Sequence, residues 1–422
     1  MLYECWRRVA RERAREPALL DLATRRQWSF AELARAAEGA PEPEGPVVYP
    51  QGNSAEFVLA ILCAWRWRRV VCPLEPGQSP PSVPLPPASC VHLKLTSATT
   101  GIPRVIGFTG AQLVADAENI MTTMGLRPDW PNLGAISMAH SYGFSNLVLP
   151  LLCYGIPLMI APAPLPEALR QAAAGIPSVT LPGVPALWRT WHEASAIPVG
   201  VRLAISAGAP LPVSVEQEVF ARSGVKIHNF YGSSECGGIA YDRSTEPRRD
   251  DACVGTPMDN VRLSLADNGC LRVHSRAAGE TYWPEPDETL GDGCFQTGDL
   301  AELKEELVFL RGRSSDQINV AGRKVSPAAV EQVLRQHAAV RECLVFGVPS
   351  NEAQRADMIV ACVASASVTQ AEELRQFLLS RLPAWQVPRQ WWFVDSLSAN
   401  SRGKISRDVW RRRFLDGQRG RV

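Results

Sequence analysis

Residues 47–72 read VVYPQGNSAEFVLAILCAWRWRRVVC, and this stretch predicts the fold class. Val47–Tyr49 is a short apolar run that is typical of a buried strand. Pro50–Ser54 is a turn whose last residue suits a helix N-cap, and Phe57–Trp67 is an apolar helix. Val70–Cys72 is predicted as a second strand. A strand, a helix and a strand in this order are typical of a parallel α/β sheet.

The same alternation continues along the chain. Apolar runs bounded by turn residues predict strands at Val91–Leu95, Ala135–Met138, Ser178–Leu181, Leu203–Ser206 and Val225–His228. Beyond about Cys253, short alternating runs predict antiparallel hairpins, and Asp267–Gly269 supplies a turn between two of them.

After Arg313 the pattern changes again. A helix, two strands and a second helix are predicted, at Pro327–Gln336, Val340–Val348, Met358–Val363 and Gln370–Leu382. Roughly a hundred residues with this pattern are typical of a small domain that folds on its own. We therefore predict an α/β fold: a large N-terminal lobe of α/β subdomains with a small antiparallel β portion, followed by a small α+β C-terminal domain.

The composition excludes several classes of function. The 44 basic and 43 acidic residues leave a formal net charge of +1, which gives no electrostatic case for binding nucleic acid or a membrane surface. We expect neither a signal peptide nor a membrane-spanning helix, since no apolar run of about 18 residues occurs. The 11 cysteines include no C-x-x-C pair, so we expect reduced thiols in a cytoplasmic protein rather than metal ligands.

The strongest local signal is TSATTGIPR at residues 96–104, directly after a predicted strand. Four hydroxyl side chains, a glycine and the cation of Arg104 lie in one loop, and such groups can surround phosphate oxygens together with backbone N–H groups. The spacing is not that of a Walker A loop. Taken alone, the stretch is equally a Thr- and Ser-rich surface turn.

Five further motifs follow this loop in order. They are MAHSYGF at 138–144, NFYGSSE at 229–235, TGDL at 297–300, GRSSD at 312–316 and SRGKI at 401–405. In this order, they resemble the adenylate-forming superfamily of acyl-CoA and aryl-CoA ligases, luciferases and peptide-synthetase adenylation domains. The resemblance implies an acid–thiol ligase that converts a carboxylic acid and ATP to an acyl-adenylate and pyrophosphate, and then to a thioester.

The resemblance also implies two domains. Residues 1–314 would form the adenylate-forming domain, and 315–422 a small mobile domain that carries the catalytic lysine, with Ser315 as the hinge. The phosphate loop begins earlier in this chain than is usual in the family. The Pro-rich connection Pro73–Pro87 is therefore predicted to replace a βα portion of a shortened first subdomain.

The resemblance assigns ATP and Mg²⁺ to particular residues. Glu235 would bind Mg²⁺, which prefers carboxylate and phosphate oxygens, and Ser234 would donate to the α-phosphate. Asp299 would accept both ribose hydroxyls, and Arg313 would also reach the ribose. The other predicted ATP-binding residues are Thr96, Ser97, Thr99, Thr100, Gly101, Arg104, Gly208, Ala209, Pro210, Tyr231, Gly232 and Ser233.

Adenylation joins two anions, so cations and hydroxyls should converge on the α-phosphate. Lys404 resembles the family's catalytic lysine, a flexible charge that bridges the carboxylate and the phosphate. His140 resembles the residue beside the carboxylate and the acceptor tunnel. The acid pocket is predicted to suit a flat aryl or enoyl acid or a fatty chain, and its residues are Tyr142, Gly143, Ala207, Gly237, Gly238 and Ile239.

Three positions depart from the family's usual residues. Ala98 replaces a glycine, Arg104 replaces a lysine, and Ser315 stands where the hinge is commonly Asp or Lys. Amino-acid-activating members carry an aspartate near His140. The stretch 135–149 contains no acidic residue, so ordinary α-amino acids are disfavoured as substrates.

Coenzyme A is the first choice of acceptor, because AGRKVSP at 321–327 resembles CoA ligases. Gly322, Arg323 and Lys324 are the predicted acceptor residues, and the two cations either bind the nucleotide part of CoA or face solvent. The alternative acceptor is the phosphopantetheine of an acyl carrier protein. A third hypothesis, motivated by Ala98, Ser315 and the shortened N-terminal region, is a non-catalytic adenylate-binding regulator.

Overall fold

The computed structural model describes residues 1–96, 104–350, 357–365, 370–397 and 406–419. The chain divides into two compact units. The larger contains Met1–Ser264, Arg272–Gln296 and Leu303–Val308, and the smaller contains Leu265–Leu271, Thr297–Glu302 and Phe309–Val422. The predicted domain boundary between residues 314 and 315 stays a prediction. None of the helices in the described ranges has both the length and the apolar composition that a bilayer crossing needs.

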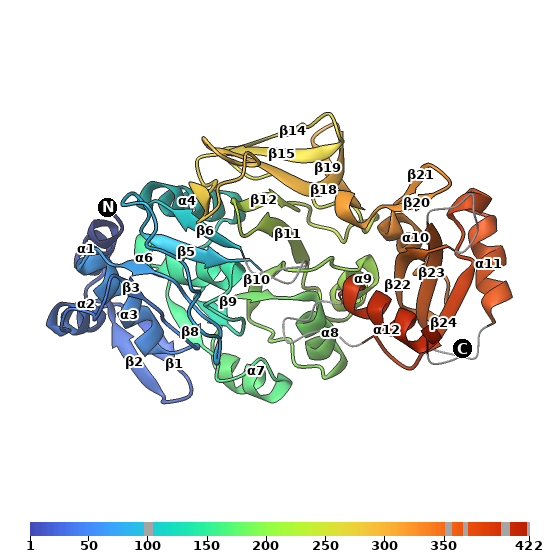
Figure 1. Ribbon diagram of the computed structural model, residues 1–422. Helices are drawn as coiled ribbons and strands as arrows, with labels where there is room; N and C mark the ends of the chain where they lie inside the picture. Colours follow the sequence, from blue (N-terminus) through green and yellow to red (C-terminus); the bar gives the residue numbers. More distant parts are fainter. Residues whose placement is uncertain (97–103, 351–356, 366–369, 398–405, 420–422) are drawn as a thin grey trace. The chain divides into compact units, whose positions relative to one another are not determined.

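A nine-stranded sheet forms the centre of the larger unit (Figure 1). Its middle strands run parallel, and the strand pairs at both of its edges are antiparallel. In spatial order the strands are β13 (Thr256–Pro257), β12 (Gly237–Tyr241), β11 (Ile227–Ser233), β10 (Val201–Ser206), β9 (Val179–Gly183), β7 (Asn132–Gly134), β8 (Leu158–Ile160), β1 (Pro17–Asp21) and β2 (Arg26–Ser29).

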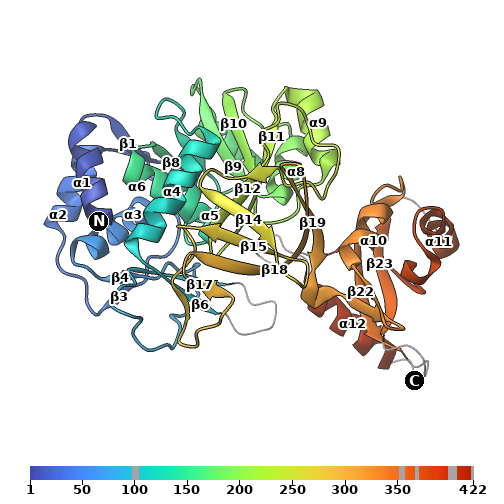
Figure 2. The ribbon, with the colours of Figure 1, turned by 90° about the horizontal axis from the view of Figure 1, so that it is seen from above.

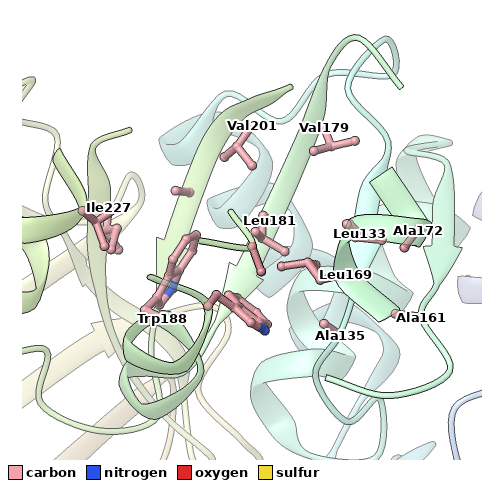
Figure 3. Close-up of a cluster of buried hydrophobic side chains, with 14 of the residues drawn as sticks. Leu133, Ala135, Ala161, Leu169, Ala172, Val179, Leu181, Trp188, Val201 and Ile227 are labelled. Atoms are coloured by element: carbon pink, nitrogen blue, oxygen red, sulfur yellow. The ribbon is translucent and has the colours of Figure 1, made fainter. Parts of the chain in front are cut away.

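Helices pack against this sheet through continuous apolar cores. One core joins β7–β11 to three helices, α7 (Pro166–Ala173), α8 (Pro185–Glu193) and α9 (Val213–Ser223). The indoles of Trp188 and Trp191 are fully buried in it. Figure 3 shows Trp188 among the side chains of this core. Other helices of this unit are α1 (Leu2–Glu12), α2 (Phe30–Gly39), α3 (Ala55–Arg66), α4 (Gly110–Met124), α5 (Ser141–Gly143), the π-helix η1 (Phe144–Val148) and α6 (Leu149–Tyr154).

The strand–helix–strand unit predicted at 47–72 is confirmed. β3 (Val47–Val48) pairs in parallel with β4 (Val70–Val71), and α3 connects them with Ser54 at its N-cap. These strands belong to a second sheet of five strands, which continues through β5 (His92–Leu95) and β6 (Val105–Phe108) to β16 (Thr281–Trp283).

The strand predicted at Ala135–Met138 is wrong. β7 ends at Gly134, and the backbone beyond it bonds to a side chain instead of a sheet neighbour. Asn53 donates from Nδ2 to the carbonyl of Ile136 at 2.9 Å, and its Oδ1 accepts the N–H of Met138 at 2.8 Å. Because the Asn53 amide pairs with the backbone groups of Ile136 and Met138, these groups do not hydrogen-bond to a neighbouring strand.

The antiparallel hairpins expected beyond Cys253 are confirmed as a third sheet (Figure 2). Gly269 has a φ of +76°, which suits the glycine of the predicted turn. The strands are β14 (Val261–Leu265), β15 (Cys270–Ser275), β18 (Cys294–Lys304) and β17 (Leu290–Gly291), and β19 (Leu307–Arg313) pairs with β18.

The smaller unit has the α+β pattern that the sequence predicts. Its three-stranded sheet is covered on one side by a core that includes side chains from α10 and α11. Its elements are η2 (Ser314–Asp316), β20 (Ile318–Val320), β21 (Arg323–Val325), α10 (Pro327–Leu334), β22 (Val340–Pro349), β23 (Asp357–Ser365), α11 (Ala371–Leu379), η3 (Ala384–Gln386), β24 (Gln390–Val394) and α12 (Arg407–Arg419). β24 and α12 were not predicted from the sequence. The predicted fold class is confirmed.

Candidate active site

The predicted phosphate loop connects two adjacent antiparallel strands. β5 ends one residue before Thr96, and β6 begins one residue after Arg104. The two end residues bond to each other: the N–H of Arg104 donates to Oγ1 of Thr96 at 3.0 Å, and the N–H of Thr96 donates to the carbonyl of Arg104 at 2.9 Å. The base of the loop is therefore closed by two hydrogen bonds. The predicted residues Ser97, Thr99, Thr100 and Gly101 lie outside the described residues.

The cation at the end of this loop is held by two residues that the sequence did not single out. The Arg104 guanidinium lies 3.4 Å from the centroid of the Tyr282 ring, and its Nη2 donates to Oδ2 of Asp287 at 2.9 Å. Hydrogen bonds from Thr289, and then the Arg104 cation, hold the pKa of Asp287 below its usual range. Asp287 is therefore an anionic anchor that orients Arg104 beside the loop.

Glu235 lies in the turn between β11 and β12, and it also contacts Tyr282. The phenol hydroxyl donates to Oε1 of Glu235 at 3.2 Å. Burial and the negative charge of Glu235 raise the pKa of Tyr282, so the phenol stays a donor at neutral pH. Tyr282 thus contacts both the cation of the phosphate loop and the predicted magnesium carboxylate.

The neighbours of Glu235 are arranged by short contacts. Ser141, at the start of α5, donates from Oγ to Oγ of Ser234 at 2.9 Å. The thiol of Cys236 is fully buried, and this burial raises its pKa. β11 extends to Ser233, and residues 234–236 form the turn that carries Glu235.

The environment of Glu235 fits a magnesium ion that arrives with ATP. The carboxylate is half-buried, and the described part of the chain contains no group of three or more His, Cys, Asp or Glu side chains arranged to hold a metal. Mg²⁺ is commonly bound by one or two carboxylates, with phosphates and water completing its shell. A single carboxylate near a phosphate loop is consistent with that mode of binding.

His140 and the next turn form a second part of the site. Nδ1 of His140 accepts the N–H of Tyr142 at 3.3 Å, which caps the short helix α5. Oη of Tyr142 donates to the carbonyl of Ile205 at 3.3 Å. A Cβ on Gly143 would lie 1.9 Å from the carbonyl oxygen of Ser137, so only glycine fits this close backbone approach.

The small residues of the predicted acid pocket are explained in part by what packs behind them. A Cβ on Gly238 would lie 2.2 Å from Sδ of Met258, and one on Gly237 would lie 2.0 Å from Oδ1 of Asp116. Ala207 and Ile239 are buried. Among the residues predicted at adenine, Ala209 and Tyr231 are partly buried, whereas Gly208, Pro210 and Gly232 are exposed. Their roles at adenine and the acid stay predictions.

The predicted ribose residues lie together in the smaller unit. Nε of Arg313, at the end of β19, donates to Oδ1 of Asp299 on β18 at 3.0 Å. Half of the Arg313 side chain is exposed, whereas Asp299 is only 18% exposed. The Arg313 cation thus orients the carboxylate of Asp299, and a carboxylate is the kind of group that accepts hydrogen bonds from ribose hydroxyls.

The hinge and acceptor residues also lie in this unit. Ser315 is in the short helix η2, and Gly322 is at the turn of the β20–β21 hairpin with a φ of +82°. Arg323 lies 5.3 Å from the ring centroid of Trp385, while Lys324 is exposed. Lys404 lies outside the described residues.

A half-buried arginine near Lys404 in the sequence was not predicted. Arg407, the first residue of α12, donates from Nη1 to Asp316 at 2.6 Å and from Nη2 to both oxygens of Glu331 at 2.8 Å. Its Nε donates to the carbonyl of Val345 at 3.1 Å. Arg407 therefore ties the start of α12 to the residue after the predicted hinge, to α10 and to β22.

Comparison with known proteins identifies the family. The family model of AMP-binding enzymes matches residues 78–286, and the model of the AMP-binding enzyme C-terminal domain matches residues 329–404. The chain belongs to the AMP-binding enzyme family.

Curated relatives are CoA ligases. Feruloyl-CoA synthase of an Amycolatopsis species is 27% identical over 379 residues, covering 84% of this chain and 77% of the relative. Anthranilate–CoA ligase of Pseudomonas aeruginosa is 27% identical over 424 residues, covering 94% and 80%. A long-chain-fatty-acid–CoA ligase of Escherichia coli O157:H7 is 29% identical over 366 residues, covering 80% and 63%.

Solved structures agree on the fold. ATP-bound MatB of Rhodopseudomonas palustris has a TM-score of 0.85 at 20% identity, with 99% of both chains covered. The anthranilate CoA ligase AuaEII in complex with anthranoyl-AMP has a TM-score of 0.82 at 18% identity, covering 98% of this chain and 96% of that one. The chain is thus an AMP-forming acid–thiol ligase, as the resemblance implied.

Proposed function

We propose that this enzyme activates an aromatic carboxylic acid with ATP and transfers the acyl group to coenzyme A. A carboxylate oxygen attacks the α-phosphorus, the bond from that phosphorus to the bridging oxygen breaks, and pyrophosphate leaves. The CoA sulfur then loses its proton and attacks the acyl carbon, and AMP leaves. We propose an aromatic acid rather than a fatty acid because this chain matches more of the length of the feruloyl and anthranilate ligases than of the fatty-acid ligase.

One observation carries the proposal: Tyr282 contacts both Arg104, the cation at the end of the phosphate loop, and Glu235. The ring lies 3.4 Å from the Arg104 guanidinium, and its hydroxyl lies 3.2 Å from the Glu235 carboxylate. A phosphate-binding cation and a magnesium-binding carboxylate must serve the same triphosphate. Pre-placed charges of this kind stabilise the transition state without reorganising during the reaction.

Mg²⁺, when bound with ATP, neutralises phosphate charge and makes the α-phosphorus more electrophilic. Glu235 would hold it, and Ser234 would donate to the α-phosphate. Thr96 and Arg104 would bind the β- and γ-phosphates at the base of the loop. Asp299, oriented by Arg313, would accept the ribose hydroxyls.

The remaining predicted residues act on the acid and the acceptor. Lys404 would bridge the carboxylate and the α-phosphate during adenylation, and His140 would border the carboxylate. Rotation about Ser315 would then bring the β20–β21 hairpin, with Gly322, Arg323 and Lys324, to the acceptor. The enzyme would work in the cytoplasm, where its 11 free thiols stay reduced.

The test is a panel of acids offered to the purified enzyme with ATP and Mg²⁺, with pyrophosphate release as the readout. Ferulate, anthranilate, other aryl acids, enoyl acids and fatty acids are compared, and free CoA or a phosphopantetheinylated carrier protein is then added. Release that requires an aryl acid, with an aryl-CoA detected by mass spectrometry, supports the proposal. Pyrophosphate release with fatty acids alone would overturn the choice of an aromatic acid. Acyl product on the carrier protein alone would overturn the choice of coenzyme A. ATP binding without acid-dependent release favours a non-catalytic regulator.

A further inference from the structure

Lys94 and Asp116 form an ion pair in the interior of the larger unit. Nζ of Lys94, on β5, lies 3.8 Å from Oδ2 of Asp116, on α4, and the two side chains are 3% and 2% exposed. Among the described residues Nζ has no hydrogen-bond partner, and it lies 4.5 Å from the ring centroid of Phe108. Such a pair is expensive to bury, and apolar residues of similar volume often pack at lower cost. Stability alone therefore does not explain it.

The carboxylate of Asp116 contacts the chain that follows Glu235. Oδ1 accepts the N–H of Gly238 at 3.3 Å, and Oδ2 accepts the hydroxyl of Ser145 at 2.6 Å. Gly237 packs so closely on Oδ1 that a Cβ there would lie 2.0 Å away. Asp116 thus contacts the far side of the turn that carries Glu235.

The ammonium of Lys94 belongs to the strand that leads into the phosphate loop. Lys94 pairs with Ile106 across β5 and β6, and Thr96 follows it by two residues. Burial lowers the pKa of Lys94, and the negative charges of Asp116 and Glu235 act in the opposite direction.

We propose that the Lys94–Asp116 pair is a positioning element that fixes the base of the phosphate loop relative to the Glu235 turn. The proposal rests on the functions proposed above for Thr96, Arg104 and Glu235. A charge pair in a medium of low polarity resists separation. Its two members attach to the two chain segments that must bind one Mg·ATP complex. Both residues act through these segments and touch neither ATP nor the acid.

The test compares Lys94→Met, Lys94→Arg, Asp116→Asn and the double variant Lys94→Met/Asp116→Asn. We expect Lys94→Met to raise the KM for Mg·ATP and the Mg²⁺ concentration for half-maximal rate by about 10-fold or more, since small displacements of binding groups are costly. Lys94→Arg should recover part of this loss. The double variant should be more stable than Lys94→Met, because it leaves no unpaired buried carboxylate, but its KM for Mg·ATP should stay raised, because the pair is still absent.

Lys226→Met is the matched control. Lys226 forms a buried ion pair with Glu216 and Asp242 in the same unit, and its ammonium bonds to neither the loop base nor the Glu235 turn. We expect a similar loss of Tm with the KM for Mg·ATP unchanged. An unaltered KM in folded Lys94→Met and Asp116→Asn, or an equal rise in Lys226→Met, would overturn the proposal.

Mg·ATP binding by calorimetry is measured alongside turnover, so the result does not depend on the acid. If wild-type enzyme binds Mg·ATP but shows no acid-dependent pyrophosphate release, the proposed reaction fails, and binding by the variants still decides the positioning role. If Lys94→Met does not fold, Asp116→Asn and the double variant give the same comparison. Normal binding by both then overturns the inference.

Discussion

The hydroxyl of Tyr282 donates to Oε1 of Glu235 at 3.2 Å, while the Arg104 guanidinium lies over the same ring. Tyr282→Phe keeps the ring and removes the hydrogen bond. We expect the Mg²⁺ concentration for half-maximal adenylation to rise by about 10-fold, because a hydrogen bond to a charged group contributes about 1.5 kcal/mol or more. The KM for the acid should stay constant. Magnesium titrations of pyrophosphate release measure both, and an unaltered magnesium dependence contradicts the role.

Arg104 depends on Asp287 for its orientation, through a bond of 2.9 Å. In Asp287→Asn the charge that holds the guanidinium is lost, and the KM for ATP should rise by about 3-fold to 10-fold, as for a loosened charged contact. Arg104→Ala should have a larger effect, because it removes the cation itself. The control is Arg311→Ala, whose exposed pair with Glu302 is not part of the proposed site. An equal rise in the control would show that Asp287 has no special function.

Lys404→Ala separates the two half-reactions. Adenylate formation from acid and ATP should fall by about 100-fold or more, since a charge at the developing anion is lost. Thioester formation from supplied acyl-adenylate should continue, because the rotated small domain would have moved Lys404 away. Single-turnover assays of each step test this. Equal loss of both steps contradicts the two-orientation mechanism.

Asp242 should make stability pH-dependent. Burial by itself raises the pKa of this carboxyl, but hydrogen bonds from Lys226 and Ser244 outweigh it and hold the pKa below the ordinary value. The stabilisation is therefore complete above about pH 4, the unfolded-state pKa, and is lost as the pH falls through the lower folded-state pKa. Asp242→Asn should cost about 3 kcal/mol at pH 7, and the difference should shrink below pH 4.

Asp259→Asn is the control for this measurement, because its pair with Arg243 is largely exposed. Such pairs contribute about 1 kcal/mol or less. Denaturant unfolding at pH 7, 5 and 3.5 gives the comparison. A deficit in Asp242→Asn that is as large at pH 3.5 as at pH 7 would contradict the assignment.

The sequence predicted most elements whose signal is local. The unit at 47–72 was predicted because its apolar runs, its turn and its N-cap are contiguous, and β3, α3 and β4 match it. The order of short motifs indicated the family for the same reason. The strand at 135–138 was mispredicted because its backbone partner is Asn53, which is more than eighty residues earlier in the chain.

Residues whose roles depend on contacts with residues far away in the sequence belong to no recognisable motif. Tyr282 contacts Arg104 only because β16 pairs with β6, bringing residues 282 and 106 together. Asp287, Asp116 and Arg407 likewise belong to no motif in the sequence. Lys94 is one of only five lysines in the sequence, but its partner on α4 is visible only in the folded chain.

The buried thiol beside Glu235 has a chemical consequence. An acyl-adenylate is a mixed anhydride that reacts with sulfur nucleophiles, and the thiolate is the reactive form. Cys236 is fully buried and its pKa is raised, so it remains a thiol and does not compete for the activated acid. We therefore expect that Cys236 is not acylated and that the acyl-adenylate remains available to the thiol of the acceptor.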